Sequence, residues 1–338
     1  MNSKTTITTR QIFSAPTSKM APCRDLVSSR DLTSKEAEGL LSLTTLLKAR
    51  PEDFRTALSG KQLAMFFEKP SLRTRLTFEA GMASLGGVSF FIDQTHERLN
   101  ARETLSDIAH NVERWVDAVV MRTYEQSSIE GMAEHASIPV INALSGLEHP
   151  CQALADYFTL QEKCGDLKNV QLAYVGDGNN VANSLLLTCA LLGSSIRVAT
   201  PQGYGPDADL LLEAQAIAQH TGARVEVMID PREAVDGAHA VYTDQWTSMG
   251  WEKEASHRVP KFAPYQINKK LMDCAAPLAL FMHCLPAHRG QEVTEEVIDS
   301  EQSVVFDQAE NRMHIQKAIL VWLLGGGIGR FWVRSAHA

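Results

Sequence analysis

Short apolar runs alternate with longer segments of helical periodicity along nearly the whole of this 338-residue chain. The run 62–67 has the length of a buried strand, and the segment 72–85 after it repeats its apolar residues at helical spacing. Further strand-length runs lie at 88–92, 118–121, 138–141, 170–175, 195–199, 223–228, 239–243 and 278–282. Helical periodicity also marks 34–48, 103–115, 150–163, 180–192, 207–220, 231–236 and 308–324, and a long irregular loop is expected after the run at 239–243. Strands that alternate with helices form parallel sheets covered on both faces, so we expect an α/β fold.

The length of the chain indicates two domains. A chain of 338 residues exceeds an ordinary single core, and both halves show the same alternation of strands and helices. We therefore predict two doubly wound domains, each a parallel sheet flanked by helices, joined by interdomain helices. In such sheets ligands bind beyond the carboxyl ends of the strands. The unusual polar residues of this chain lie at those ends: Ser71, Arg73, Arg122, His149, Asn179, Asn180, Asp244 and Cys284.

The composition excludes several classes of function. Hydrophobic residues make up 44% of the chain and charged residues 21%, as in ordinary globular proteins. The formal net charge of −8 argues against a partner that is nucleic acid or an anionic membrane surface. No apolar run approaches the roughly 18 residues of a membrane-spanning helix. The six cysteines show no CxxC pair and no disulfide spacing, which indicates reduced thiols in a cytosol-like compartment.

Residues 1–20 differ in composition from the rest of the chain. They carry Lys4, Arg10 and Lys19, no acidic residue, and many Ser and Thr residues. This composition weakly resembles an organellar transit peptide, but it lacks the apolar core of a secretory signal. We predict a disordered tail and a cytoplasmic protein, with an organelle matrix as the alternative if the tail is a transit peptide.

The segment FEKPSLRTR, between the first strand and its helix, predicts an anion site. Pro70 favours an extended residue before it, and Ser71 is a good N-cap for the helix that follows. The turn thus directs a helix N-terminus and the guanidinium groups of Arg73 and Arg75 toward one point. Arginine supplies planar, paired donors that match phosphate or carboxylate. The alternative is a capped helix with surface arginines, in which Arg75 pairs only with Glu79, four residues on.

Arg122 and His149 are further candidates for the same site. Arg122 directly follows the apolar run at 118–121; it is either a structural ion-pair partner or an anion ligand, and the nearby anion site favours the second role. Pro150 is a helix start signal, so His149 occupies the N-cap and points out of the helix mouth. Whether neutral or charged, its imidazole could polarise a carbonyl oxygen. Gln152 shares this end of the helix and can both donate and accept hydrogen bonds.

The segment GDGNN resembles part of the dinucleotide-binding fingerprint, but the match is incomplete. Val181 stands where a third glycine is needed, and no acidic residue ends the next strand. We therefore reject NAD as a cofactor. Asn179 and Asn180 at the helix start suit a carboxylate or an amino-acid backbone instead.

Asp244 and Cys284 follow two later strands. Asp244 opens a long charged loop, which is either a solvated connection or a lid, and its carboxylate could bind an ammonium group. No ligand set with zinc spacing accompanies Cys284, and a nucleophilic cysteine would need a partnered base. We prefer Cys284 as a polar donor beside Asp244. Arg312, near the start of the last helix, remains open to an ion pair with Glu310 or to a ligand role.

The motifs SLRTR, MRT, HPCQ, GDGNN, DQWTSMG, HCLP and ENR, in this order, resemble those of the aspartate/ornithine carbamoyltransferases, specifically the ornithine enzymes. The resemblance covers about residue 22 to about residue 325. The pattern SxRTR, present here as SLRTR, is shared by the superfamily, whereas HPCQ, the SMG loop and HCLP separate the ornithine enzymes from the aspartate enzymes. The resemblance implies transfer of the carbamoyl group of carbamoyl phosphate to the δ-amine of L-ornithine, giving L-citrulline and phosphate. It also implies that no metal or organic cofactor takes part.

The resemblance further implies domains, an assembly and site residues. Residues 21–149 with 312–330 would form the carbamoyl-phosphate domain and residues 150–311 the ornithine domain, in a homotrimer or a multiple of trimers. The carbamoyl phosphate site would comprise Ser71, Leu72, Arg73, Thr74, Arg122, His149, Gln152, Cys284, Leu285 and Arg312. The ornithine site would comprise Asn180, Asp244, Ser248 and Met249. The catalytic residues would be Arg122, His149, Asp244, Cys284 and Arg312.

Two alternatives remain open from the sequence. A relative that uses N-acetylornithine, putrescine or aspartate would share most of these motifs. A carbamoyltransferase-like subunit that only binds or regulates is disfavoured, because it would be free to lose Arg122 or Cys284. Within the leading interpretation, Asp244 is assigned chiefly to the α-ammonium of ornithine, since pairing with the δ-ammonium would oppose the loss of its proton.

Overall fold

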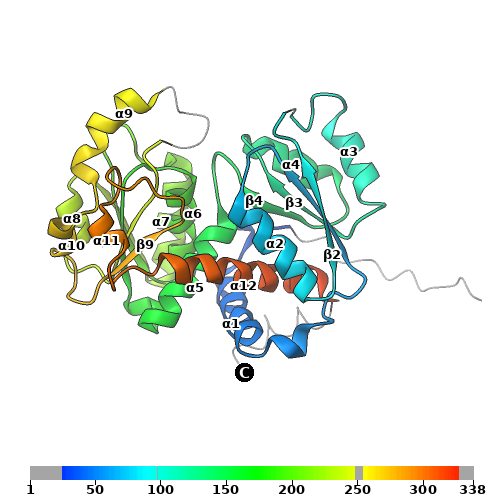
Figure 1. Cartoon of the computed structure of the whole chain (residues 1–338), viewed down its shortest axis with the longest axis horizontal. Coiled ribbons are helices and arrows are strands. Elements are labelled where there is room, and N and C mark those ends of the chain that lie inside the picture. The colour runs from blue at the N-terminus through cyan, green and yellow to red at the C-terminus, as the bar shows by residue number, and fades with distance from the viewer. Residues whose placement is uncertain (1–24, 97, 248–253, 327–338) are drawn as a thin grey trace, which may run out of the picture.

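The computed structural model describes residues 25–96, 98–247 and 254–326. The predicted tail at 1–20 therefore lies outside the described residues, as do Ser248 and Met249 of the predicted ornithine site. The chain forms two lobes side by side, each built on a parallel sheet with helices around it (Figure 1). No helix among the described residues is long and apolar enough to cross a membrane.

The first lobe contains a four-stranded parallel sheet with the order β2-β1-β3-β4. Its strands are β1 (Gln62–Phe67), β2 (Val88–Asp93), β3 (Ala118–Arg122) and β4 (Val140–Leu144). The chain runs outward from β1 to β2 and then crosses to β3 on the other side of β1. The carboxyl ends of β1 and β3 therefore flank the point where the winding reverses, which is where such sheets bind ligands.

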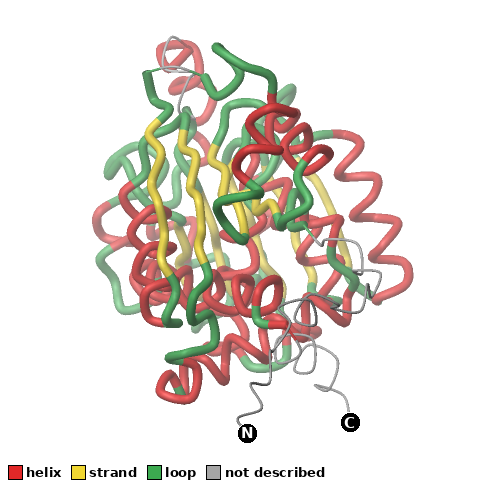
Figure 2. The backbone as a smooth tube through the Cα atoms, turned by 90° about the vertical axis from the view of Figure 1, so that its right-hand side faces the viewer, coloured by secondary structure: helices red, strands yellow, loops and turns green. Residues whose placement is uncertain are grey.

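The second lobe contains a five-stranded parallel sheet with the order β7-β6-β5-β8-β9. Its strands are β5 (Gln171–Val175), β6 (Ser195–Ala199), β7 (Arg224–Met228), β8 (Ala240–Thr243) and β9 (Leu280–His283). The winding reverses between β5 and β8. The prediction of two doubly wound parallel sheets flanked by helices is confirmed, and Figure 2 shows strands lying between helices.

Twelve α-helices lie within the described residues. They are α1 (Ser34–Ala49), α2 (Leu72–Ser84), α3 (Leu105–Val112), α4 (Gln126–His135), α5 (Pro150–Cys164), α6 (Asn180–Leu192), α7 (Ala208–Thr221), α8 (Pro231–Val235), α9 (Ala255–Phe262), α10 (Lys269–Met272), α11 (Glu295–Ile298) and α12 (Val305–Leu324). Helix α5 begins at Pro150 with His149 as its N-cap, as the sequence predicts.

Three expectations about helices were wrong. Helix α4 lies where the sequence pattern predicts no element, because it buries only Ile129 and Met132 and so shows little periodicity. The connection after β8 is not irregular, since it contains α9 and α10; α9 is only eight residues long and carries Pro260, which hides its pattern. Helix α12 begins at Val305 rather than 308, so Arg312 lies about two turns inside it instead of one.

Helices α5 and α12 pack against each other where the two lobes meet (Figure 1). Helix α12 also packs on α1 and α2. Every residue of α5 from Pro150 to Leu160 is buried, as expected for a helix covered on all sides. One buried apolar cluster continues through both lobes, from Phe67 of the first sheet past Ile319 of α12 to Tyr242 of the second sheet. This shared core holds the carboxyl ends of the two sheets around one cleft.

Candidate active site

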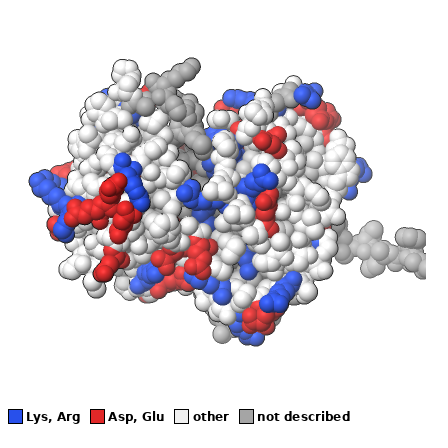
Figure 3. All heavy atoms as spheres, in the orientation of Figure 1, with Lys and Arg blue, Asp and Glu red and all other residues white. Residues whose placement is uncertain are grey.

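A cleft of about 330 Å³ lies between the lobes and is lined by residues from both. It gathers every described residue of the predicted site: Ser71, Leu72, Arg73, Thr74, Arg122, His149, Gln152, Asn180, Asp244, Cys284, Leu285 and Arg312. Lys and Arg side chains are visible where the lobes meet (Figure 3). The described residues of the predicted site, from Ser71 to Arg312, therefore line one cavity.

The cleft also contains residues that the sequence reasoning missed. Lys69 lines it from the turn before α2, with its Nζ atom 4.5 Å from the centre of the Tyr124 ring. The available signal was a third basic residue in FEKPSLRTR, beside Arg73 and Arg75. Gln245 lines the cleft beside Asp244, and its Nε2 donates to the carbonyl of Pro286. A larger hollow of about 570 Å³ lies beside α3, but its lining is mostly apolar and includes none of the predicted site residues.

The N-terminus of α2 forms one wall of the cleft. Ser71 is its N-cap, and the Ser71 Oγ atom accepts a hydrogen bond of 3.2 Å from the backbone N–H of Thr74. The other N–H groups of the first turn have no partner within the helix, and the helix dipole adds positive potential there. Arg75, in contrast, pairs with Glu79 on the surface and stacks on Phe91, so it matches the structural alternative considered for it.

Two buried guanidinium groups lie on the same side of the cleft as the N-terminus of α2. Arg122 is the last residue of β3 and Arg312 comes from α12, and both are almost fully buried. The Nη2 atom of Arg312 donates to Thr74 Oγ1 over 2.6 Å, and among the described residues Arg312 forms no ion pair with Glu310, which pairs with Lys48 and His314. The Nε atoms of Arg122 and Arg312 are buried without a hydrogen-bond partner among the described residues. Buried charges of this kind require an anion to balance them.

The pKa of Arg122 reflects its burial and its charged neighbour. Burial, followed by repulsion from Arg312, lowers the pKa of Arg122 from 12.5 to about 9. The guanidinium group therefore stays charged at neutral pH but is poorly solvated. A bound phosphate or a developing oxyanion strongly stabilises the charge of such a group, because it replaces the water that the group has lost.

His149 lies beside these arginines at the N-terminus of α5. Its backbone N–H donates to Ser184 Oγ over 2.8 Å, which fixes the cap residue. Burial, and then the charges of Arg312 and Arg122, hold the pKa of His149 well below its usual value. The imidazole is therefore neutral at physiological pH, which settles the question that the sequence left open. Its Nδ1 atom is buried with no partner among the described residues.

The opposite wall carries the start of α6. Asn179 is its N-cap: the Oδ1 atom accepts from the backbone N–H of Val181 and Ala182, and the Nδ2 atom donates to Asp244 Oδ2 over 2.8 Å. Asn179 thus orients Asp244 and does not line the cleft. Asn180 does line it, with one amide N–H used by the carbonyl of Ser145. A side-chain amide has two N–H donors, so one remains for a carboxylate.

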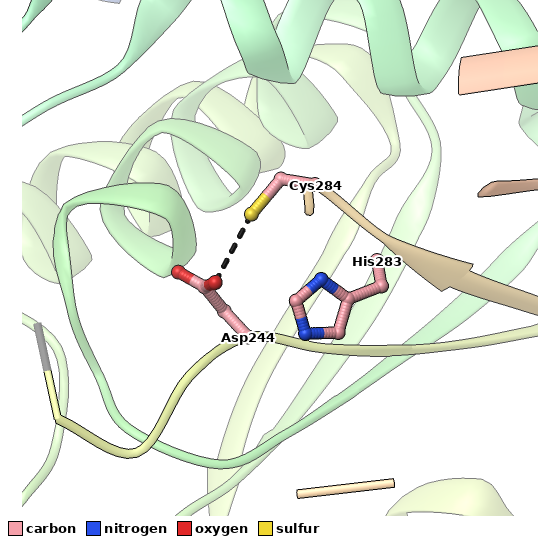
Figure 4. Close-up of side chains that lie close together, drawn as sticks. All are labelled: Asp244, His283 and Cys284. Atoms are coloured by element: carbon pink, nitrogen blue, oxygen red, sulfur yellow. Dashed lines mark hydrogen bonds between the residues drawn. The ribbon is translucent and has the colours of Figure 1, made fainter. Parts of the chain in front are cut away.

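Asp244 and Cys284 point toward each other from the ends of β8 and β9 (Figure 4). The Cys284 Sγ atom lies 3.0 Å from Asp244 Oδ1 and donates to it. Burial, and then the neighbouring Asp244 carboxylate, raise the pKa of the Cys284 thiol well above its usual value. The thiol therefore stays protonated and acts as a donor beside Asp244, as the sequence interpretation preferred. It is not an activated nucleophile.

His283 completes a group with Asp244 and Cys284 whose potential ligand atoms lie within 4.8 Å of one another. The geometry does not suit a metal ion. His283 Nδ1 accepts from the backbone N–H of Leu285 over 2.8 Å, and Nε2 lies 3.3 Å from Glu292 Oε1. A neutral imidazole has one lone pair, and here the Leu285 N–H group occupies it. His283 thus orients the turn that carries Cys284.

Comparisons with known proteins agree with this arrangement. Residues 24–162 match the family described as the aspartate/ornithine carbamoyltransferase carbamoyl-P binding domain, and residues 168–323 match the corresponding Asp/Orn binding domain. The chain is 48% identical to an ornithine carbamoyltransferase of Pyrococcus abyssi over 308 residues, which cover 90% of this chain and 96% of that protein. It is 47% identical to the anabolic ornithine carbamoyltransferase of Pyrococcus furiosus, again over 308 residues, 90% of this chain and 97% of that one. A solved structure of the ornithine carbamoyltransferase from Pyrococcus furiosus superposes with a TM-score of 0.87 at 48% identity, covering 90% of this chain and 97% of that one.

Proposed function

Since the chain belongs to the aspartate/ornithine carbamoyltransferase family, we propose that it transfers the carbamoyl group of carbamoyl phosphate to the δ-amine of L-ornithine. The products are L-citrulline and phosphate. One observation carries the proposal: two buried guanidinium groups, whose Nε atoms have no hydrogen-bond partner among the described residues, face a carboxylate–thiol pair across a single cleft. The first feature suits an acyl phosphate, and the second suits an amino acid.

The phosphate group binds at the start of α2. Ser71, Leu72, Arg73 and Thr74 supply side-chain and backbone donors, and Arg122 adds its guanidinium group from the end of β3. The support is the first turn of α2, which lines the cleft and where the N–H groups and the helix dipole favour an anion. Arg312 holds Thr74 in place and also faces the ligand.

The carbamoyl end lies deeper, next to His149. Arg122, Arg312 and neutral His149 donate to the carbonyl oxygen, while Gln152 and the Cys284–Leu285 backbone hold the amide. Attack of the amine then places negative charge on an oxygen that already faces preorganised donors. Loss of one such donor typically lowers the rate by about 10²–10³-fold. Phosphate leaves while still paired with arginine, and no metal or organic cofactor takes part.

Ornithine enters from the side of the second lobe. The Asp244 carboxylate binds chiefly its α-ammonium, Asn180 binds its carboxylate, and the Cys284 thiol lies near the attacking amine. Ser248 and Met249 are proposed to contribute from the segment outside the described residues. An amine with a pKa of ~10.4 is about one-thousandth neutral near pH 7.5, at a cost of about 4 kcal/mol. The nearby arginines lower that cost by repelling the ammonium form.

The domain division and the assembly are also proposals. Residues 21–149 with 312–330 form the carbamoyl-phosphate domain, residues 150–311 form the ornithine domain, and residues 1–20 are a tail. Packing of α12 on α1 and α2 supports this division. We further propose a homotrimer, or a multiple of trimers, in the cytoplasm, with an organelle matrix as the alternative. Light scattering of the purified protein measures the assembly directly.

An assay of citrulline formation by the purified protein tests the activity. Citrulline formation from carbamoyl phosphate and ornithine is compared with carbamoylation of N-acetylornithine, putrescine and aspartate, and we expect turnover with ornithine far above the others. Arg73→Ala should abolish turnover and leave the fold intact. Arg75→Ala is the matched control, because Arg75 pairs with Glu79 on the surface. Near-normal activity of the Arg73 variant would refute the phosphate assignment.

A further inference from the structure

A buried carboxylate lies directly behind the cleft. Asp156 is fully buried on α5, one turn after Gln152. Its Oδ1 atom accepts from Gln152 Nε2 over 2.7 Å and from Gln308 Nε2 over 2.9 Å. Its Oδ2 atom accepts from the Tyr242 hydroxyl over 3.0 Å. Asp156 thus joins α5, α12 and β8 but does not line the cleft.

The contacts around Asp156 fix which atom of each amide faces it. Gln308 Oε1 accepts from the backbone N–H of His283 over 2.9 Å, so the NH₂ group of Gln308 must point to Asp156. Burial raises the pKa of Asp156 to about 7, although its three hydrogen bonds and the charge of Arg312 act against this rise. Gln152, Gln308 and Tyr242 all donate hydrogen bonds to Asp156. This pattern matches an ionised carboxylate, because that group only accepts hydrogen bonds.

Gln152 is held in one orientation by this arrangement. Its NH₂ group donates to Asp156, so its Oε1 atom points away from Asp156. That oxygen is buried and has no hydrogen-bond partner among the described residues, although Gln152 lines the cleft. An unpaired buried acceptor at this position requires an N–H donor from a ligand.

We propose that Asp156 is a positioning residue that holds the Gln152 amide with its oxygen toward the cleft, where it recognises the NH₂ group of the carbamoyl substrate. The inference rests on the proposed function and deepens it. Asp156 never touches the substrate. Its effect is selectivity: a carbamoyl group can donate to Gln152 Oε1, whereas the methyl group of acetyl phosphate leaves that oxygen unpaired.

The test compares three ligands that share the phosphate group. Binding of carbamoyl phosphate, acetyl phosphate and inorganic phosphate is measured by calorimetry in the wild type and in Asp156→Ser. A serine hydroxyl and a water molecule beside it both donate and accept, so neither enforces one orientation of Gln152. We expect the wild type to prefer carbamoyl over acetyl phosphate by about tenfold or more, as for a buried acceptor left unpaired. The serine variant should lose this preference and keep its affinity for inorganic phosphate.

Two further variants separate positioning from general support of the fold. Asp156→Asn should retain the preference, because its oxygen can face the two glutamines while its NH₂ group donates to the Tyr242 hydroxyl. Tyr242→Phe removes a donor from the other carboxylate oxygen and should also retain it. If Asp156→Ser does not fold, Asp156→Leu, which has the same branched shape and no acceptor, replaces it.

The outcomes distinguish this inference from the proposed function. A wild-type protein that forms no citrulline contradicts the proposed function itself. If the wild type forms citrulline and discriminates between the two acyl phosphates, an equally selective serine variant overturns the role of Asp156. A serine variant that weakens all three ligands by the same factor also overturns it, because a merely structural role would have that effect.

Discussion

Replacing Arg122 by methionine should stabilise the free protein while destroying its phosphate site. The pKa of Arg122 falls from 12.5 to about 9, chiefly because of burial and secondly because of Arg312. At ~1.36 kcal/mol per pKa unit, this drop corresponds to a penalty of about 5 kcal/mol for keeping the group charged in the fold. At pH 7 the group is charged in both the folded and the unfolded chain, so the full penalty applies. It fades only as the pH rises above about 9, where the folded protein releases the proton.

The expected gain in stability is smaller than this penalty, because the protein around a new apolar side chain relaxes. Replacing buried ion pairs by well-packed apolar residues of similar volume is often neutral or stabilises by ~1–4 kcal/mol. We expect a gain in that range for Arg122→Met, measured by urea unfolding without phosphate at pH 7. Phosphate at 100 times its Kd should stabilise the wild type by about 2.7 kcal/mol and the variant by much less.

The matched control is Arg75→Met on the surface of α2. Arg75 is half exposed and paired with Glu79, and such pairs contribute ~0–1 kcal/mol. This variant should therefore change stability little and respond to phosphate like the wild type. A phosphate-free Arg122→Met protein that is less stable than the wild type would refute the reasoning. So would an unchanged response of that variant to phosphate.

Three further outcomes follow from the site. Cys284→Ser should keep kcat/KM for ornithine within about tenfold, because the serine hydroxyl still donates to Asp244 and no step needs a thiolate; complete inactivity would point to a nucleophile. His149→Ala should lower kcat by about 10²–10³-fold. Since the pKa of His149 in the free protein is held well below 6.5, wild-type kcat/KM for carbamoyl phosphate should show no loss from its protonation between pH 6 and 8, and a loss with an apparent pKa near 6.5 would contradict a neutral His149. Asn179→Ala removes the cap of α6 and a donor to Asp244, so we expect unfolding stability to fall by about 1 kcal/mol and KM for ornithine to rise; equal KM values would show that Asp244 needs no such support.

The strands and most of the helices could be predicted because their signals are local. Helix α6 and strand β6 occupy the predicted ranges, since their apolar residues are buried in regular patterns. The N-caps Ser71 and His149 were also readable, because a cap and its helix are neighbours in sequence. Helix α4 was missed for the converse reason: with two buried residues it has almost no periodicity to read.

Several features of the site depend on contacts between residues far apart in the chain. Thr74 and Arg312 are 238 positions apart, and no local pattern shows that they share a hydrogen bond. The neutral state of His149 likewise depends on burial beside two arginines from other elements. Asp156 reads in the sequence as an ordinary acidic residue of a helix. Its burial and its three donors exist only because α5, α12 and β8 meet where the lobes join. Periodicity and caps act over a few residues, whereas burial and charge balance arise only once distant segments have packed together.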